Sequence, residues 1–140
     1  MDELSLHIYF SANTIARKLS KMADDHFKPF GFTSSYAFMI MAVNRNSGLS
    51  QKEVSTLFQL APSTVTRFVD KLVKMGLMER KQDGKEVMLV LTPKGKEMVK
   101  RIEDEFALLN TRISEAWGDK YLDTLNRMAR HGIQMLDEQD

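Results

Sequence analysis

The stretch "APSTVTRFVDKL", residues 61–72, places hydroxyl and basic side chains where a helix is predicted to begin. Pro62 suits the first turn of a helix, because its missing N–H would have no hydrogen-bond partner there. Ser and Thr are mediocre inside a helix, since they compete with its backbone for hydrogen bonds. Their presence therefore indicates contacts outside the helix. The polar residues of interest are Ser63, Thr64, Thr66, Arg67, Lys71 and Lys74.

The apolar residues of this stretch predict which side of the helix faces the protein core. Each residue of a helix turns by about 100°, so the inward side is predicted to hold Val65, Phe68, Val69 and Leu72. The opposite side then holds Ser63, Arg67 and Lys74, with Thr64, Thr66 and Lys71 on its flanks.

A polar face of this composition is suited to contact DNA. Short hydroxyls let the start of a helix approach a groove closely, where they can bond phosphates or base edges. The guanidinium of Arg67 matches O6 and N7 of guanine, and Lys71 and Lys74 are placed for phosphates. Asp70 would repel phosphate, so we expect it to pair with Arg67 or Lys74 at helical spacing.

A solvated helix face would show some of the same residues, so the surrounding elements decide the interpretation. Ser50 and Glu53 form a capping box that predicts a short helix over 51–58. A tight connection leads to the helix over 62–75. Asp83-Gly84 predicts a hairpin turn between two short strands. A helix, a tight turn, a second helix and a β-hairpin form a winged helix-turn-helix.

Longer helices are predicted on both sides of this lobe. An apolar stripe predicts a helix over 4–27, which Pro29 and Gly31 end. Thr33 or Ser34 can cap the next helix, which is apolar on all sides over 36–43 and ends at 46–48. Thr92 and Pro93 start a long helix, and Gly118 separates it from a last helix that Asp119 caps. The fold class is mainly α with a small β-hairpin wing.

The composition of the chain excludes several classes of function. The chain has 140 residues and no cysteine, so thiolate catalysis and Cys-based zinc sites are excluded. The three histidines match no metal-ligand spacing, and no catalytic motif or cofactor site is apparent. Residues 62–100 carry nine Lys and Arg against five Asp and Glu, whereas 101–140 carry five against nine. This basic segment favours a polyanionic partner, and the acidic N-terminus, unlike a signal peptide, predicts a cytoplasmic protein.

The segments "STVTRFVDKL", "MGLMER" and "LTPKG", at their mutual spacing, resemble the MarR family of bacterial transcription regulators. The resemblance covers residues 1–140 and implies a winged helix-turn-helix lobe over 32–94 with dimerisation helices over 1–30 and 95–140. It implies a homodimer on a pseudo-palindromic operator, with Ser63, Thr64, Thr66 and Arg67 on the helix that reads DNA. In the family, small aromatic or anionic effectors often bind between the dimer helices and this lobe.

The predicted wing departs from the family pattern. The family usually carries Asp-x-Arg there, with the Arg in the minor groove, whereas this chain has Asp83-Gly84-Lys85. Lys is more strongly hydrated than Arg and enters a narrow groove less readily. We therefore expect Asp83 and Lys85 to lie at the DNA, with Lys85 either in the groove or at a phosphate.

These observations predict a homodimeric, sequence-specific DNA-binding regulator, most simply a repressor under the control of an effector. The alternative is a winged helix that docks a protein and has no role at DNA. That alternative requires an apolar outward face on the helix over 62–75, and the face predicted here is polar and basic.

Overall fold

A computed structural model describes residues 3–46 and 48–140, apart from the side chain of Ser5. Two compact units are distinguished along the chain, residues 1–105 and 106–140. No described helix is both long and apolar enough to cross a lipid bilayer. In chain order the elements are η1 (Glu3–Leu6), α1 (Ile8–Phe27), η2 (Lys28–Phe30), α2 (Ser34–Arg45), β1 (Leu49–Ser50), α3 (Gln51–Phe58), α4 (Pro62–Lys74), β2 (Met78–Asp83), β3 (Glu86–Leu91), α5 (Pro93–Trp117) and α6 (Asp119–Asp137).

The start of α2 is held by a residue from α1. Thr33 is the N-cap residue but makes no side-chain cap hydrogen bond. Instead, the Asp24 carboxylate accepts hydrogen bonds from Ser34 N at 2.9 Å and from Ser34 Oγ at 2.7 Å. The prediction of a local Thr33 or Ser34 cap is therefore wrong, because an acceptor ten residues away satisfies this helix start.

Helix α2 provides much of the core of the lobe. Its buried residues include Ala37, Met39, Ile40 and Val43. The segment 36–43 is apolar on all sides, which favours a fully buried helix, but Phe38 is 50% exposed, so the helix is not buried on that side. Of the predicted end at 46–48, Asn46 is the C-cap residue and Ser47 lies outside the described residues.

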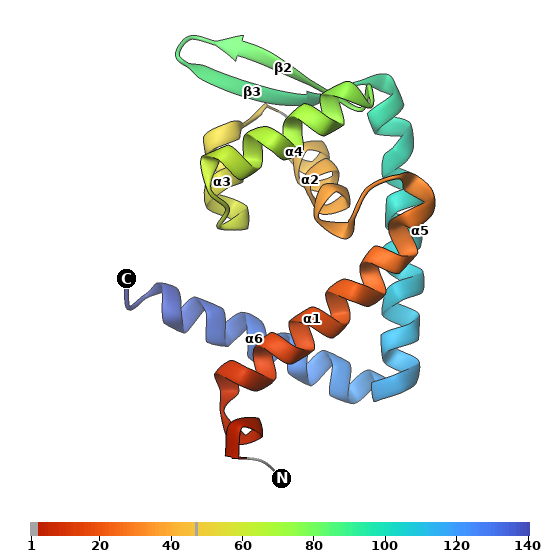
Figure 1. The fold of residues 1–140 in the computed structure, drawn as a ribbon, viewed down its shortest axis with the longest axis vertical. Helices are drawn as coiled ribbons and strands as arrows, with labels where there is room; N and C mark the ends of the chain where they lie inside the picture. The colour runs from red at the N-terminus through yellow and green to blue at the C-terminus, as the bar shows by residue number, and fades with distance from the viewer. Residues whose placement is uncertain (1–2, 47) are drawn as a thin grey trace. The chain divides into compact units, whose positions relative to one another are not determined.

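The capping box that begins α3 is confirmed in both directions. Glu53 N donates to Ser50 Oγ at 3.0 Å, and Ser50 N donates to the Glu53 carboxylate at 2.7 Å. After a tight turn α4 begins at Pro62 and runs beside α3 (Figure 1). Val65, Val69 and Leu72 of α4 are fully buried, as the apolar stripe predicts.

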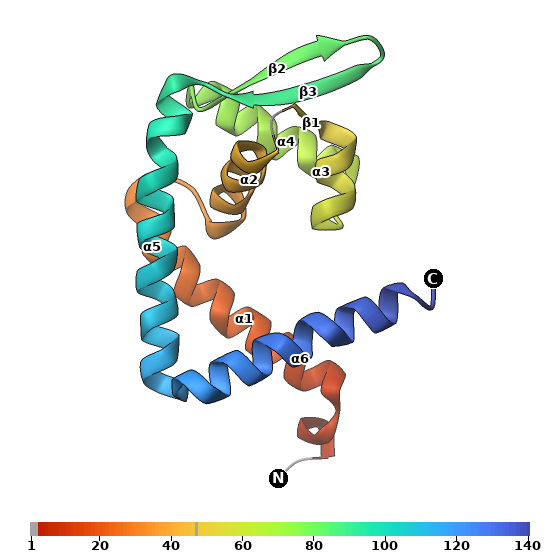
Figure 2. The ribbon, with the colours of Figure 1, turned by 180° about the vertical axis from the view of Figure 1, so that it is seen from behind.

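The wing is a two-stranded hairpin with one additional short strand. Asp83 pairs with Glu86, so Gly84 and Lys85 form the two-residue turn, and Gly84 has a φ of +60°. Leu49 and Ser50 pair with the far edge of β3, giving the strand order β1-β3-β2 (Figure 2). No sequence pattern predicts β1. It ties the start of α3 to the wing.

The start of α5 packs closely against the turn that follows α4. Thr92 Oγ1 accepts from Gly95 N at 3.0 Å, which confirms the predicted cap, and donates to the Gly76 carbonyl at 2.6 Å. Thr92 N also donates to the Leu77 carbonyl at 3.1 Å. The segments "MGL" and "LTPKG" therefore contact each other through their backbones. This contact joins the end of the wing to the end of α4.

Helix α6 begins after a glycine rather than after an acidic cap. Gly118 is the N-cap residue, with a φ of +82°, and makes no side-chain cap bond. Asp119 is the first helical residue and accepts a hydrogen bond from Ser114 Oγ at the end of α5. The predicted Asp119 cap is therefore wrong, because the carboxylate bonds the preceding helix.

Candidate nucleic-acid interface

The outward side of α4 presents side chains with no partner inside the chain. Ser63, Arg67 and Lys74 are exposed, and Thr64 is half-exposed. In the described part of the chain, none of these four side chains makes a hydrogen bond, ion pair or ring contact. Two hydroxyls, one guanidinium and one ammonium are therefore available to an external partner. A helix N-terminus with free hydroxyls and a basic row is suited to a polyanion.

One flank of α4 is fastened to the wing and to α3 by Arg80 of β2. Arg80 Nη2 lies 2.5 Å from the Asp70 carboxylate and 3.2 Å from the Thr66 carbonyl. Arg80 Nε donates to Gln51 Oε1 at 3.0 Å. The prediction that Asp70 pairs with Arg67 or Lys74 is therefore wrong. The wing supplies the counter-ion of Asp70, which leaves both of those cations free.

The hydroxyl of Thr66 belongs to the same network. It donates to the Pro62 carbonyl and accepts from Gln51 Nε2, each at 3.0 Å. Thr66 is exposed, but its hydroxyl already has a donor and an acceptor partner. It therefore differs from Ser63 and Thr64, whose hydroxyls have neither in the described part of the chain.

The other flank of α4 is fastened to α2. The Lys71 ammonium lies over the Tyr36 ring, 4.7 Å from its centroid. The same ring lies 4.4 Å from the ring of Phe68, centroid to centroid, at an interplanar angle of 48°. Lys71 is thus the one predicted phosphate ligand on α4 that has a partner within the described chain.

The wing carries the remaining predicted residues. Asp83 and Lys85 are exposed, and Lys85 lies in the two-residue turn at the free end of the hairpin (Figure 1). Gln82 Nε2 donates to the Gly84 carbonyl at 2.9 Å and stiffens that turn. The two-residue turn therefore places Lys85 at the end of the hairpin.

Sequence reasoning missed three residues that organise this surface: Gln51, Arg80 and Tyr36. In the sequence, Gln51 indicates only the start of a helix, and Arg80 only belongs to the segment "MGLMER" that carries the resemblance. The available signal was Asp70 itself, because an acidic residue among the cations of α4 indicates a counter-ion from another element.

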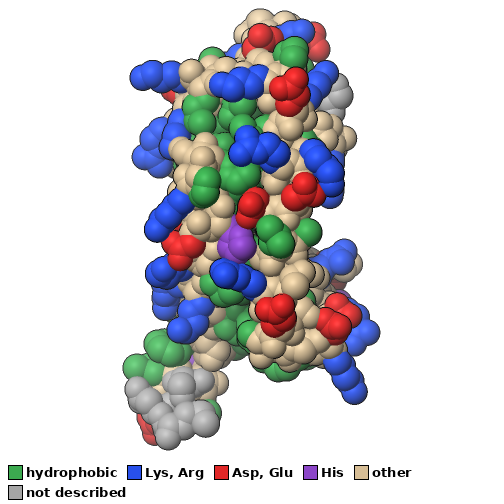
Figure 3. Space-filling model, turned by 90° about the vertical axis from the view of Figure 1, so that its right-hand side faces the viewer, with side chains coloured by type: hydrophobic (Ala, Val, Ile, Leu, Met, Phe, Trp, Pro, Cys, Tyr) green, Lys and Arg blue, Asp and Glu red, His purple; other side chains and the backbone are tan. Residues whose placement is uncertain are grey.

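Charge outside this region is mixed. On the face shown in Figure 3, Lys and Arg side chains are interspersed with Asp, Glu and hydrophobic side chains. No group of three or more metal-ligating side chains occurs within the described ranges. The case for a polyanionic partner therefore rests on the local arrangement of α4 and the wing.

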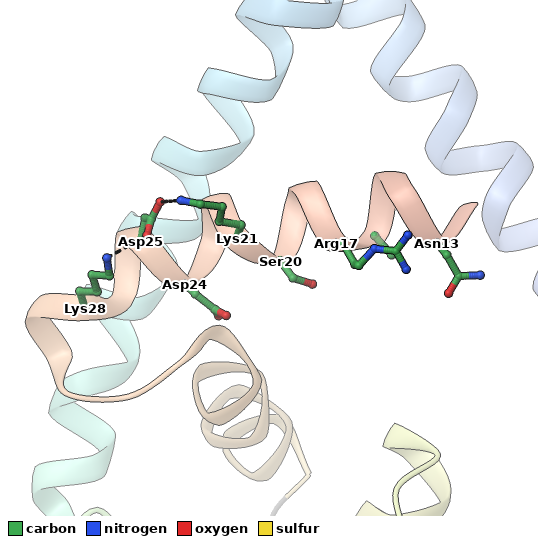
Figure 4. A pocket seen from close by; sticks show the side chains of 8 residues that line it. Asn13, Arg17, Ser20, Lys21, Asp24, Asp25 and Lys28 are labelled. Atoms are coloured by element: carbon green, nitrogen blue, oxygen red, sulfur yellow. Dashed lines mark hydrogen bonds and ion pairs between the residues drawn. The ribbon is translucent and has the colours of Figure 1, made fainter. Parts of the chain in front are cut away.

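An open hollow of about 550 Å³ runs along α1. Arg17, Lys21, Asp24 and Asp25 are among its lining residues, and Asp24 projects toward α2 (Figure 4). Asp25 lies 2.9 Å from Lys21 and 3.1 Å from Lys28. The hydrogen bond from Lys21, more than that from Lys28, lowers the pKa of the Asp25 carboxyl, and the same bond raises the pKa of Lys21.

The Arg80 network predicts a measurable stability effect. Arg80→Met is expected to lower the free energy of unfolding by about 1–2 kcal/mol, because it removes hydrogen bonds to three partners. The coupling energy with Asp70→Asn should be below about 1 kcal/mol, since both side chains are partly solvated. Denaturant unfolding of the four proteins in the cycle measures both values. Lys81→Met, at the neighbouring exposed and unpaired position, is the control, and a coupling energy of zero would contradict the network.

Comparison with known proteins finds similarity between this chain and transcription regulators. The MarR family model matches residues 33–86. The HTH-type transcriptional regulator YwoH of Bacillus subtilis (strain 168) is 30% identical over 106 residues, covering 74% of this chain and 75% of the relative.

Two solved structures have the same fold over nearly the whole chain. One is a MarR family transcriptional regulator from Listeria monocytogenes complexed with 26mer DNA, with a TM-score of 0.81, 20% identity and coverage of 95% of this chain and 91% of that one. The other is CouR from Rhodococcus jostii RHA1 bound to p-coumaroyl-CoA, with a TM-score of 0.83, 19% identity and coverage of 97% and 95%.

Proposed function

This chain belongs to the MarR family and is a DNA-binding transcription regulator, and we propose that it acts as a homodimeric repressor whose helix α4 reads a pseudo-palindromic operator. The observation that carries the proposal is the free outward row of α4, whose two flanks are fastened to other elements. A helix that recognises DNA sequence needs side chains that are available to the bases. It also needs a fixed position in the protein, because ordering a mobile helix on binding would cost affinity. The MarR family consists of regulators rather than enzymes.

Each predicted residue has a role in the proposal. Arg67 reads a guanine edge, while Ser63 and Thr64 bond phosphate or base edges at the start of α4. Lys71 and Lys74 neutralise phosphates. Thr66 keeps the start of α4 in place through its bonded hydroxyl and contacts DNA only at the margin of the interface.

The wing completes the proposed interface. We assign Lys85 to a backbone phosphate beside the groove, because the two-residue turn gives its side chain a short, rigid base and Lys is strongly hydrated. Asp83 is the last residue of β2, and its proposed role is to shape the turn that presents Lys85. Binding to the chromosome implies a cytoplasmic location.

The proposed homodimer is supported by exposed apolar side chains in the terminal helices. Ile8 is 81% exposed, Met128 64% and Leu136 71%. Apolar residues this exposed indicate a surface that another chain covers. Other exposed apolar residues in the terminal segments are Leu4, Leu6, Tyr9, Phe10, Leu108, Tyr121, Ile133 and Met135.

The dimer is expected to persist at micromolar concentration, and charged substitutions in α6 should dissociate it. Met128→Lys combined with Leu136→Glu should convert the sedimenting species from dimer to monomer, because two charges would have to be buried in the interface. Leu57→Glu is the matched control, since Leu57 is 59% exposed but lies in α3. A stable folded monomer of the unmodified protein in this range would contradict the homodimer.

Repression itself is tested by transcription in vitro. We expect the protein to reduce transcripts from a promoter that contains its operator, because a dimer seated there blocks polymerase. Arg67→Ala should lose this effect at the same protein concentration. An increase in transcripts with the unmodified protein would identify an activator and leave DNA reading by α4 intact.

We also propose control by a small aromatic or anionic effector. CouR, which shares this fold, was solved with p-coumaroyl-CoA, a ligand that is both aromatic and anionic. The hollow along α1 offers Arg17, which has no partner in the described part of the chain. It also contains Asp24, the residue that holds α2.

A further inference from the structure

Tyr36 contacts α4 at two residues that lie one turn apart. Its ring packs on Phe68 at a centroid distance of 4.4 Å, and the Lys71 ammonium lies 4.7 Å from its centroid. Phe68 and Lys71 are three residues apart, so their side chains lie on neighbouring parts of one helix flank. One ring thus provides a packing surface for α4 and a site for its cation.

The segment around Tyr36 is joined to neighbouring parts of the lobe. Two residues before Tyr36, Ser34 donates two hydrogen bonds to Asp24 of α1. The Phe32 ring lies 6.4 Å from the Tyr36 ring, centroid to centroid. Tyr36 is half-buried, whereas Lys71 is exposed. The Lys71 ammonium therefore lies over a half-buried ring and remains accessible to solvent.

We propose that Tyr36 is a positioning residue for DNA binding, whose ring orients the Lys71 ammonium toward a backbone phosphate. This inference rests on the proposed function. A cation over an aromatic face is attracted by the ring quadrupole. A lysine side chain loses much rotamer freedom when it is ordered. Because the ring restricts Lys71 before DNA arrives, part of that loss occurs during folding and not on binding.

Lys74 provides the internal comparison. It is exposed on the same helix and has no partner in the described part of the chain. Its side chain must lose its freedom when it meets a phosphate. Substituting a lysine by alanine removes both the charge of the ammonium and any orientation it had before binding. Substituting Tyr36 removes only the orientation of Lys71 and leaves its charge in place.

The duplex for the test is selected from genomic DNA of the source organism by its binding to the unmodified protein. It is then labelled with a fluorophore, and its affinity for each variant is measured by titration. Tyr36→Leu is expected to weaken binding about 3-fold for each subunit, the equivalent of an exposed cation–π contact, and therefore about 10-fold for the dimer. It should leave the slope of log affinity against log salt nearly unchanged, because the Lys71 charge is still present. Tyr36→Phe keeps the ring and should bind as the unmodified protein does.

A double-mutant cycle identifies Lys71 as the residue through which Tyr36 acts. Lys71→Met should reduce the salt slope by about 1.8, because the dimer carries two Lys71 side chains and each phosphate contact contributes about 0.9. In the Lys71→Met background, Tyr36→Leu should cause no further decrease in affinity. If Tyr36→Leu weakens binding about 10-fold in that background as well, it acts through the packing of α4, and the inference is overturned.

The outcome for Tyr36 can be separated from the outcome for the proposed function. Arg67→Ala is titrated alongside on the selected duplex and on a scrambled one. If Arg67→Ala loses selective binding while Tyr36→Leu binds normally, only the positioning role fails. If the unmodified protein shows no preference between the duplexes, the proposed function fails first. Tyr36→Phe and Lys71→Arg both preserve the cation–ring pair, and weaker binding by either variant would overturn the inference.

Discussion

Gly95→Ala is expected to lower the free energy of unfolding by about 3 kcal/mol, at the upper end of the usual cost of overpacking. A Cβ built on Gly95 would lie 2.0 Å from the Leu77 carbonyl oxygen and 3.0 Å from its carbon. Both atoms belong to backbone, and the same carbonyl accepts a hydrogen bond from Thr92 N. Neither the backbone at Leu77 nor that at Gly95 can move without breaking the junction between α4, the wing and α5.

Denaturant unfolding of Gly95→Ala and of Lys96→Ala measures this effect. Lys96 is the next residue of α5 and is exposed, so its substitution should change the free energy of unfolding by less than about 0.5 kcal/mol. In a helix without the close approach, Ala would be favoured over Gly by about 1 kcal/mol. If Gly95→Ala is as stable as the unmodified protein, the close approach to Leu77 is not as described.

Arg67→Ala is expected to reduce the free energy of operator binding by about 1–3 kcal/mol for each base edge that the guanidinium reads. That guanidinium is exposed, unpaired within the described residues and located on the outward side of α4. Its removal should relax the base preference at one position of each half-site. Arg67→Lys should restore little, because an ammonium lacks the two-pronged geometry that fits guanine.

The control for Arg67 is a lysine that binds phosphate. Lys74→Ala should weaken binding to operator and scrambled DNA alike and reduce the salt slope by about 1.8, which is about 0.9 for each of the two subunits. Lys85→Ala should behave in the same way if its ammonium lies at a phosphate. Arg67→Ala differs because it removes sequence preference as well as affinity. If Arg67→Ala retained both, α4 would not be the helix that reads base sequence.

The helix starts were predictable where their causes are local. Ser50 and Glu53 cap α3 within four residues of chain, and Pro62 and Thr92 mark the next two long helices. Where a distant residue supplies the cap, as Asp24 does for Ser34, no local pattern reveals it. The same limit applies to β1, since two residues are too few to show strand alternation.

The orientation of α4 was predictable, whereas the partners of its flanks were not. The apolar stripe at Val65, Val69 and Leu72 predicted the buried side correctly. The sequence predicts a partner for Asp70 on its own helix, because helical spacing shows which neighbours along one helix are close but not which residues of other elements are. The actual partner of Asp70 is Arg80 of β2. The two residues come together only when the wing packs against α4. The lobe boundaries at 32 and 94 and the DNA contacts of individual side chains stay predictions.

The most direct test of DNA reading by α4 is sequencing of the genomic fragments that the protein and its Arg67→Ala variant retain. We expect the unmodified protein to enrich fragments that share a pseudo-palindrome, with two half-sites separated by about one helical turn. Fragments retained by Arg67→Ala should keep that spacing but lose preference at one position in each half-site. Retention of the same sequences by both proteins, or of no common sequence by the unmodified protein, would contradict the account.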